Sequence, residues 1–279
     1  MRALVTGASG KTGRAVTAAL AGRGVPVRAV IRPESDHEGV CREAGAADVA
    51  RVDLGSGAGL HAAFEGVDLV YHLAPNVDDR EVEMAVRIAR AAETAGVRRF
   101  GFHSVLHPAE ATMPHHVRKH LAEKEVRDLF PGAVVIRPAA YQDNLVPAAL
   151  AGKIAVPYSL DAPFTNVALA DVAEVAAVVL TEEGHDSATY ELVGPQTLTV
   201  REMAEIATEV LRRVVTVRQT PIEDWVSGPG AGLPARAREQ LVAMFRSYAR
   251  EGLTGRSHDL ARVLGREPTT WAQTLTRLL

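Results

Sequence analysis

Residues 5 to 13 of the chain read Val-Thr-Gly-Ala-Ser-Gly-Lys-Thr-Gly, and this stretch decides the fold. It lies between an apolar run, Ala3 to Thr6, and an amphipathic pattern, Arg14 to Ala21. The first glycine permits a sharp turn off a strand, the second lets a pyrophosphate approach the backbone, and the third lets the next helix lie close to the sheet. The helix presents its N-terminal amides and positive dipole end to an anion. We therefore predict a dinucleotide-binding turn, whose phosphate-binding residues are Gly7, Ser9, Gly10, Lys11, Thr12 and Gly13.

Short apolar runs alternate with helical patterns through the first half of the chain. This βαβ rhythm is typical of a parallel sheet, so we expect an α/β fold, a Rossmann-type doubly wound parallel sheet. Asp78 and Glu81 have capping-box spacing and are expected to start one of the helices. The predicted strands are Ala3–Thr6, Val27–Ile31, Val49–Asp53, Asp68–Leu73, Arg99–Ser104 and Val134–Arg137.

The rhythm changes after Gly194 and Pro195. We therefore expect residues 1–195 to form the dinucleotide-binding domain, with segments near 140–170 contributing to the cleft, and residues 196–279 to form a small C-terminal α/β lobe. The elements predicted in the later part are a helix at Asp171–Leu180, a strand at Tyr190–Val193, a helix at Val200–Leu211, a strand at Val214–Val217, and helices near Pro234–Arg250 and Ser257–Val263.

The composition excludes several classes of partner. A net charge of −3 and a pI near 6.4 leave no basic field for nucleic acid or an anionic membrane, so we expect a small-molecule substrate. Cys41 is the only cysteine, so no disulfide can form within the chain. Because there is no signal peptide and no long apolar run, a cytoplasmic location is expected. The sequence allows a monomer or a homodimer.

The end of the second predicted strand bears on the choice of dinucleotide. An acidic residue there binds the ribose 2′-hydroxyl of NAD, whereas an arginine accommodates the 2′-phosphate of NADP. The chain has Arg32 at this point, and Lys11 adds a second positive charge. We therefore favour NADP over NAD. In the alternative interpretation Arg32 is solvated and Glu34 holds the ribose.

Two further strand ends are expected to contact the dinucleotide. Asp53 and Leu54 follow the third strand, where the carboxylate can accept from the adenine amino group and the leucine can pack on the ring. After the fourth strand, small residues permit close approach to the ribose and nicotinamide, and this passage consists of Leu73, Ala74, Pro75 and Asn76.

At this point the chain resembles the NmrA-like branch of the atypical short-chain dehydrogenase/reductase superfamily. The resemblance implies a Rossmann domain that binds NADP(H) or NAD(H) and a small C-terminal lobe that forms one wall of a substrate cleft. It leaves open whether the chain is a quinone reductase or a sensor of cofactor redox state. The segments that carry it are Thr6–Arg14, Phe102–Pro108, Met113–Lys119 with Glu123, Ile136–Asn144 and Leu192–Pro195.

Typical members of this superfamily use a tyrosine four residues before a lysine, but none of the five tyrosines here has that spacing. The expected helix instead carries His115 and Lys119, one turn apart, and Ser104 occupies the expected serine position. An imidazole, whose pKa is about 6.5 when unperturbed, is a better proton donor at neutral pH than a phenol. We expect Lys119 to hold the nicotinamide ribose, His115 to donate a proton or orient substrate, and Ser104 to hydrogen-bond the reacting oxygen. In the alternative, His115 only caps the helix and no chemistry follows.

Polar residues near the carboxyl edge of the sheet are expected to line the substrate pocket, and these are His107, Tyr141, Gln142 and Asn144. The histidines near residue 115 include a pair with zinc-ligand spacing, His116 and His120, but no cysteine is near and no HExxH sequence occurs, so we expect no metal. The sequence thus favours an NADP(H)-dependent oxidoreductase of a quinone, enone or ketone. A redox-sensing binding protein and a biosynthetic enzyme with a non-redox step remain alternatives.

Overall fold

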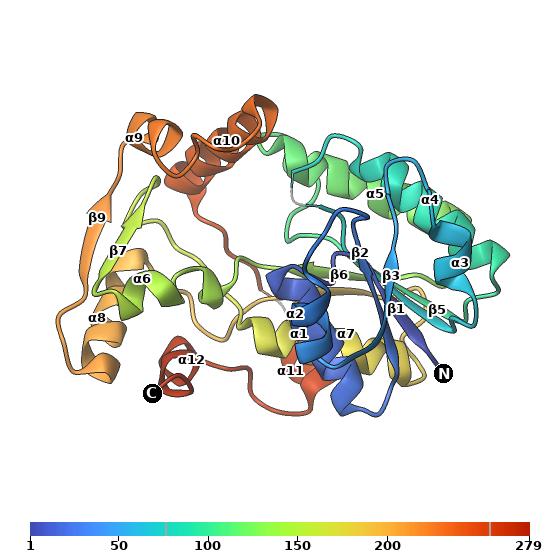
Figure 1. Ribbon diagram of the computed structural model, residues 1–279. Coiled ribbons are helices and arrows are strands. Elements are labelled where there is room, and N and C mark those ends of the chain that lie inside the picture. Colours follow the sequence, from blue (N-terminus) through green and yellow to red (C-terminus); the bar gives the residue numbers. More distant parts are fainter. Residues whose placement is uncertain (76, 257) are drawn as a thin grey trace. The chain divides into compact units, whose positions relative to one another are not determined.

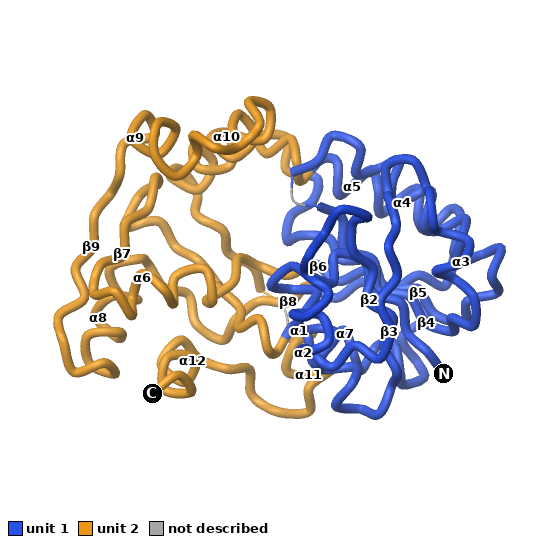
Figure 2. The backbone as a smooth tube through the Cα atoms, viewed as in Figure 1, with its two compact units in different colours: residues 1–109, 117–137, 172–190 blue, residues 110–116, 138–171, 191–279 orange. Residues whose placement is uncertain are grey.

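The computed structural model describes residues 1–75, 77–256 and 258–279, which form two compact units (Figure 2). The first unit consists of residues 1–109, 117–137 and 172–190. The second consists of residues 110–116, 138–171 and 191–279. The two units interleave along the chain.

A seven-stranded sheet is the centre of the first unit, in the order β3-β2-β1-β4-β5-β6-β8 (Figure 1). The neighbouring pairs from β3 to β6 are parallel. Hydrogen bonds from Val135 N to Ala188 O and from Ala139 N to Leu192 O, each 2.9 Å, give β8 the same direction beside β6. The predicted doubly wound parallel sheet is therefore confirmed. Its strands are β1 (Ala3–Val5), β2 (Val27–Ile31), β3 (Ala46–Arg51), β4 (Leu69–His72), β5 (Arg99–His103), β6 (Val134–Pro138) and β8 (Thr189–Leu192).

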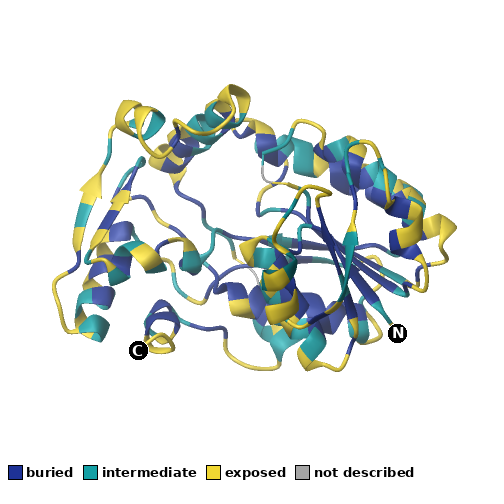
Figure 3. Cartoon of the chain, in the orientation of Figure 1, coloured by how far each residue is buried: buried dark blue, intermediate teal, exposed yellow. Residues whose placement is uncertain are grey.

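Helices cover both faces of this sheet (Figure 1). One face packs against α3 (Leu60–Phe64), α4 (Glu81–Thr94) and α5 (Pro114–Leu129), with a core that includes Phe100 and Phe102. The other face carries α1 (Lys11–Gly22), α2 (Glu38–Glu43) and α7 (Leu169–Thr181). Because both faces are covered, the five inner strands are almost continuously buried (Figure 3), as is expected of a parallel sheet, whereas the edge strands β3 and β8 are only partly buried.

The expected capping box at the start of α4 is wrong. The residue before the helix is Arg80, and no side chain caps the first turn. Asp78 accepts instead from the backbone N–H of Arg80 at 2.9 Å. Glu81 lies on the same helix stripe as Ala85, Ile88 and Ala92, so its side chain is directed into the unit, where it forms an ion pair.

The second unit contains a parallel pair of strands, β7 (Lys153–Val156) and β9 (Thr216–Gln219). Its core gathers around the fully buried Trp271, whose indole N–H donates to Met203 O at 2.8 Å. Capping boxes start two helices, Thr199 with Glu202 at α8 and Thr270 with Gln273 at α12. Its remaining elements are the 3-10 turn η1 (Gln142–Asn144), α6 (Val146–Leu150), α8 (Val200–Leu211), α9 (Ile222–Ser227), α10 (Ala235–Glu251), α11 (Asp259–Leu264) and α12 (Trp271–Thr276). Of the predicted helix near Ser257–Val263, residue 257 lies outside the described residues.

Candidate cofactor and active site

The glycine turn has the geometry that the sequence predicted. Gly7 adopts a φ of +60°, in the left-handed region that favours glycine. A Cβ on Gly13 would lie 2.2 Å from the Gly7 carbonyl oxygen, so the close contact between the turn and the first turn of α1 excludes any side chain there. Gly10, the residue before α1, has no side chain to cap the helix, and the first turn contains no acidic residue. These features fit a bound pyrophosphate at this helix N-terminus.

Arg32 follows β2 directly and is exposed, as are Lys11 and Glu34. The loop between Arg32 and Ser35 is fixed by Arg51, whose Nη1 donates to Pro33 O at 2.9 Å and to Ser35 O at 2.8 Å. The loop is therefore held at the end of β2 without using the Arg32 side chain. The choice between NADP and NAD at this strand end stays a prediction.

Asp53 and Leu54 lie in the turn after β3. The Asp53 carboxylate accepts from Ser56 Oγ at 2.7 Å and from Gly55 N at 2.8 Å, and these hydrogen bonds lower the pKa of Asp53. The Leu54 carbonyl accepts from Arg87 at 2.7 Å, and the leucine packs partly against the core of the unit. Both residues thus stabilise the turn that we expect to lie beside the adenine.

A buried network joins the end of β1 to the end of β4. Thr6 Oγ1 lies 2.8 Å from His72 Nδ1 and accepts from Leu73 N at 2.9 Å. Burial, and secondarily the charge of Lys119, lowers the pKa of His72 to about 3, so this histidine is neutral at neutral pH. The network fixes the backbone that leads into Ala74 and Pro75. Ala74 is half-buried and Pro75 is exposed. Asn76, the last residue of the predicted passage, lies outside the described residues.

Ser104 follows β5, where its backbone N–H donates to Ile136 O at 2.8 Å. Its side chain is fully buried, and its hydroxyl has no hydrogen-bond partner within the described part of the chain. A buried hydroxyl without a partner is costly and rare. Ser104 therefore has a donor and an acceptor available for a ligand.

Lys119, on α5, contacts two groups near the end of β5. Its Nζ donates to the carbonyl oxygen of His103 at 3.1 Å and forms an ion pair with Glu81, which is 2% exposed. Burial raises the pKa of Glu81, and the charge of Lys119 opposes that shift. The ammonium also lies 5.6 Å from the centre of the Phe102 ring. These contacts fix the position of the Lys119 ammonium next to the backbone that leads into Ser104.

His103 and Glu123 support this arrangement. Tyr71 Oη lies 2.7 Å from His103 Nδ1, and burial, with a smaller effect of Lys119, lowers the pKa of His103 to about 3. Glu123, four residues after Lys119 on α5, accepts from Arg137 Nε at 3.0 Å and so connects the helix to β6. Glu81, His72 and His103 were not among the site residues predicted from the sequence. Glu81 could have been found, because a carboxylate on an otherwise apolar helix stripe indicates a buried partner.

Other predicted residues belong to the second unit. His115 is in the first turn of α5, is buried, and meets the ring of His116 edge to face at a centroid distance of 4.5 Å. Gln142 is 2% exposed, and its amide contacts the carbonyls of Asn166 and Thr269 and the hydroxyl of Thr274. Because both ends of that amide are engaged, Gln142 has a structural role, and we leave it out of the proposed site.

Tyr141 is half-buried and Asn144 is exposed, both in the second unit, while His107 is exposed in the first unit with a φ of +51°. Within residues 1–75, 77–256 and 258–279, no three histidine, cysteine or acidic side chains are placed to hold a metal ion. Across the same residues, no helix is both long enough and apolar enough to span a membrane.

A family model described as the NmrA-like family matches residues 1–273. The chain belongs to this family. The predicted resemblance is thereby confirmed, and it covers both compact units rather than the glycine turn alone.

Two relatives match nearly the whole chain. Quinone oxidoreductase 2 of Escherichia coli is 26% identical over 98% of this chain and 97% of its own. The NAD(P)H azoreductase of Xenophilus azovorans is 27% identical over 97% of this chain and 95% of its own length.

Solved structures agree with these relatives. The E. coli quinone oxidoreductase complexed with NADPH has a TM-score of 0.81 at 25% identity and covers 99% of both chains. The triphenylmethane reductase of Citrobacter sp. complexed with NADP(H) has a TM-score of 0.83 at 25% identity and covers 100% of both. The dinucleotide that we expected is the one present in these structures.

Proposed function

We propose that this NmrA-like protein is an NADP(H)-dependent reductase that acts on a quinone, enone or ketone. The observation that carries the proposal is the fixed Lys119 beside the unpartnered hydroxyl of Ser104, at the carboxyl end of β5. Parallel α/β sheets bind ligands at this edge. The proposal is also supported by the relatives, which are named reductases and oxidoreductases.

The residues of the first unit fit the dinucleotide. Backbone at Gly7, Gly10 and Gly13 would hold the pyrophosphate, where a Cβ on Gly13 could not be accommodated. Lys11 and Arg32 would bind the 2′-phosphate. The other residues proposed for binding are Ser9 and Thr12 at the phosphates, Asp53 and Leu54 at the adenine, and Ala74, Pro75 and Lys119 at the ribose and nicotinamide.

Lys119 has one ammonium N–H beyond those directed to Glu81 and His103 O, and we assign it to a ribose hydroxyl. When bound, NADPH supplies a hydride from its nicotinamide ring. When the substrate accepts this hydride, negative charge develops on its oxygen, and that oxygen must then receive a proton. Ser104 would donate a hydrogen bond to that oxygen, and His115 would supply the proton.

We assign the proton donor to His115 rather than to His72 and His103, the histidines at the ends of β4 and β5. His72 and His103 have pKa values of about 3, so neither carries a second proton at neutral pH. His115 lies one helical turn before Lys119 on α5. His107, Tyr141 and Asn144 are proposed to contact the rest of the substrate.

The experiment is steady-state oxidation of NADPH with a panel of quinones, enones and ketones. We expect turnover of at least one class, and a large loss of kcat in both Ser104→Ala and His115→Gln. Retention of full activity by His115→Gln would remove its assigned role. Absence of turnover with every class, combined with strong discrimination between NADPH and NADP⁺ in binding, would instead indicate a sensor.

The cofactor preference has its own test. Reversing the charge in Arg32→Glu should weaken NADPH binding and leave NADH binding largely unchanged, because only NADPH carries the 2′-phosphate. Arg23→Glu is the control, since Arg23 follows α1 and pairs with Thr181 and Glu182 instead. An unchanged ratio of the two dissociation constants in Arg32→Glu would contradict the assignment.

A further inference from the structure

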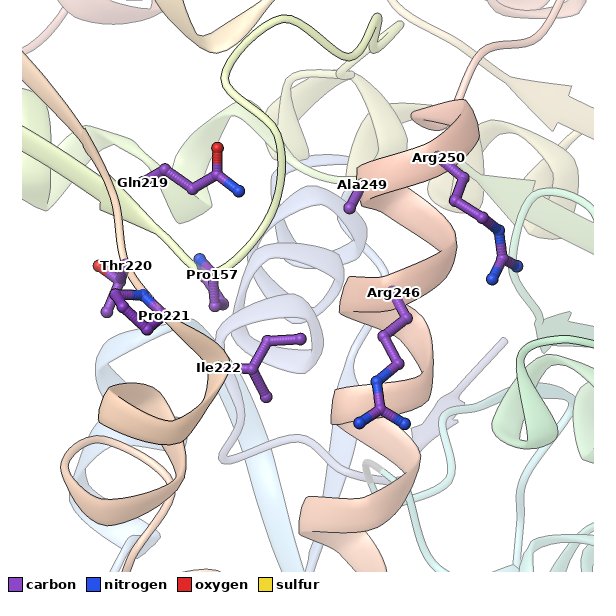
Figure 4. Close-up of a pocket in the computed structure, with 8 residues that line it drawn as sticks. All are labelled: Pro157, Gln219, Thr220, Pro221, Ile222, Arg246, Ala249 and Arg250. Atoms are coloured by element: carbon purple, nitrogen blue, oxygen red, sulfur yellow. The ribbon is translucent and has the colours of Figure 1, made fainter.

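A hollow of about 530 Å³ lies in the second unit, and none of the residues assigned above lines it (Figure 4). One wall is the segment from the end of β9 to the start of α9, with Pro157 after β7. The opposite wall is α10. The lining residues are Pro157, Gln219, Thr220, Pro221, Ile222, Arg246, Ala249 and Arg250. Its size lies within the range of about 300 to 1,000 Å³ that is typical of small-molecule pockets.

The walls of this hollow are fixed by packing and hydrogen bonding. Thr220 N donates to Val156 O at 2.8 Å, which connects the end of β9 to the end of β7. Trp225 of α9 meets Phe245 of α10 edge to face, with centroids 4.8 Å apart. Tyr248, also on α10, is buried and meets Tyr158 in the same way at 5.6 Å. The helix that carries the arginines is therefore held against the opposite wall.

Two arginines lie on the α10 wall of the hollow. Arg246 and Arg250 lie one turn apart on α10, and no hydrogen bond or ion pair holds either of them in the parts of the chain described above. Arg201 of the same unit, by contrast, pairs with Asp161 at 2.7 Å. Nearby, Asp224 of α9 is already paired with Arg218 at 3.7 Å.

We infer that this hollow is a binding site for a small anionic molecule with an apolar body, such as an aromatic carboxylate, sulfonate or phosphate. The guanidinium groups of Arg246 and Arg250 would hold the anionic group, since arginine donors match the geometry of such oxygens. Pro157, Pro221 and Ile222 would contact the apolar body, and Gln219 and Thr220 add hydrogen-bonding groups at the rim. The inference concerns binding alone and does not depend on reductase activity.

The test is calorimetric titration of the full chain with naphthalene-2-sulfonate, without any dinucleotide. Saturable binding is expected, with weaker binding of the neutral naphthalene-2-sulfonamide. The double variant Arg246→Gln/Arg250→Gln should bind the sulfonate about tenfold more weakly, because two charge-assisted contacts are lost. Ala249→Leu should also weaken binding, since it fills the hollow and keeps both charges.

Arg238→Gln is the matched control, because it removes one charge from α10 outside the lining residues. It should bind the sulfonate like the unmodified protein. No saturable binding, equal affinity in the double variant, or an equal loss in Arg238→Gln would each overturn the inference. Circular dichroism of every variant confirms that the helices are retained, so a folding defect is not mistaken for a lost site.

Discussion

At the scale of single residues, the ion pair between Glu81 and Lys119 decides how the candidate site is held. A buried ion pair does not by itself add much stability, because desolvation offsets the attraction of the charges. It does make each partner dependent on the other, since removing one leaves a charge buried. The pair therefore serves to orient Lys119 more than to stabilise the fold.

Glu81→Gln should lower the free energy of unfolding by about 1 to 3 kcal/mol, the lower end reflecting the partial exposure of Lys119. Lys119→Met should have a similar effect, and the double variant should be less destabilised than the sum of the two. Urea denaturation measures all three. Glu83→Gln is the control, because Glu83 lies in the same first turn of α4 but is exposed. Strict additivity would show that the two charges do not interact.

The buried neutral histidines predict a pH dependence of stability. The folded-state pKa of His103 is about 3, below the ordinary value of about 6.5, so between these values the unfolded chain binds a proton that the folded chain does not. Stability from this source is present above pH 6.5 and is lost as the pH falls toward 3, by about 1.4 kcal/mol per pH unit for one histidine. His72 contributes in the same window.

His103→Asn should reduce this slope by about half, because Asn can keep a hydrogen bond to Tyr71 but does not titrate. The measurement is the free energy of unfolding in urea between pH 4 and pH 7. His120→Asn, at an exposed position, should leave the slope unchanged. An unaltered slope in His103→Asn would mean that this imidazole is protonated in the folded protein.

At the scale of elements, the alternation of apolar runs and helical patterns predicted the first six strands and their parallel direction. β2 and α8 were predicted at their observed bounds. β3 begins three residues earlier than expected, at Ala46, because its pairing partner Val27 begins β2. β7 was not predicted, since four residues that alternate between exposed and buried positions leave a weak signal.

The candidate site was predicted unevenly for a related reason. The glycine turn follows from local spacing between a strand and a helix, whereas Ser104 and Lys119 follow from the resemblance to the short-chain dehydrogenase/reductase superfamily. Glu81 and His103 reach Lys119 from helix and strand positions distant in sequence, and only the fold brings them together. The capping-box spacing at Asp78 was misleading because the pairing of Glu81 with Lys119 outweighs a local cap.

Two glycines of α1 provide a matched comparison. Gly13→Ala should weaken NADPH binding by about fivefold to about 150-fold, because its Cβ would lie 2.2 Å from Gly7 O and overpacking generally costs about 1 to 3 kcal/mol. Gly22→Ala, whose Cβ would meet nothing within 4 Å, should bind normally and be slightly stabilised, by up to about 1 kcal/mol. Titration with NADPH and thermal unfolding measure both. Normal binding in Gly13→Ala would contradict the assigned phosphate turn.

At the scale of the whole molecule, every residue proposed to hold the dinucleotide belongs to the first unit. Saturating NADPH should therefore slow hydrogen exchange chiefly in residues 5–14, 69–75 and 99–104, where the turn and the ends of β4 and β5 lie. Exchange followed by mass spectrometry, with and without NADPH, measures this. Protection centred on residues 200–279 would place the dinucleotide elsewhere.

The interleaving of the two units constrains how the chain can be divided. A fragment that stops at residue 195 would contain β7 but not β9, and so would expose an unsatisfied strand edge. It would also lack Trp271 and α8, against which the apolar residues of α6 and β7 pack. Such a truncated protein should precipitate rather than yield a minimal nucleotide-binding module. During synthesis, the core around α6 and β7 can be completed only after the ribosome has released the segment that contains Trp271.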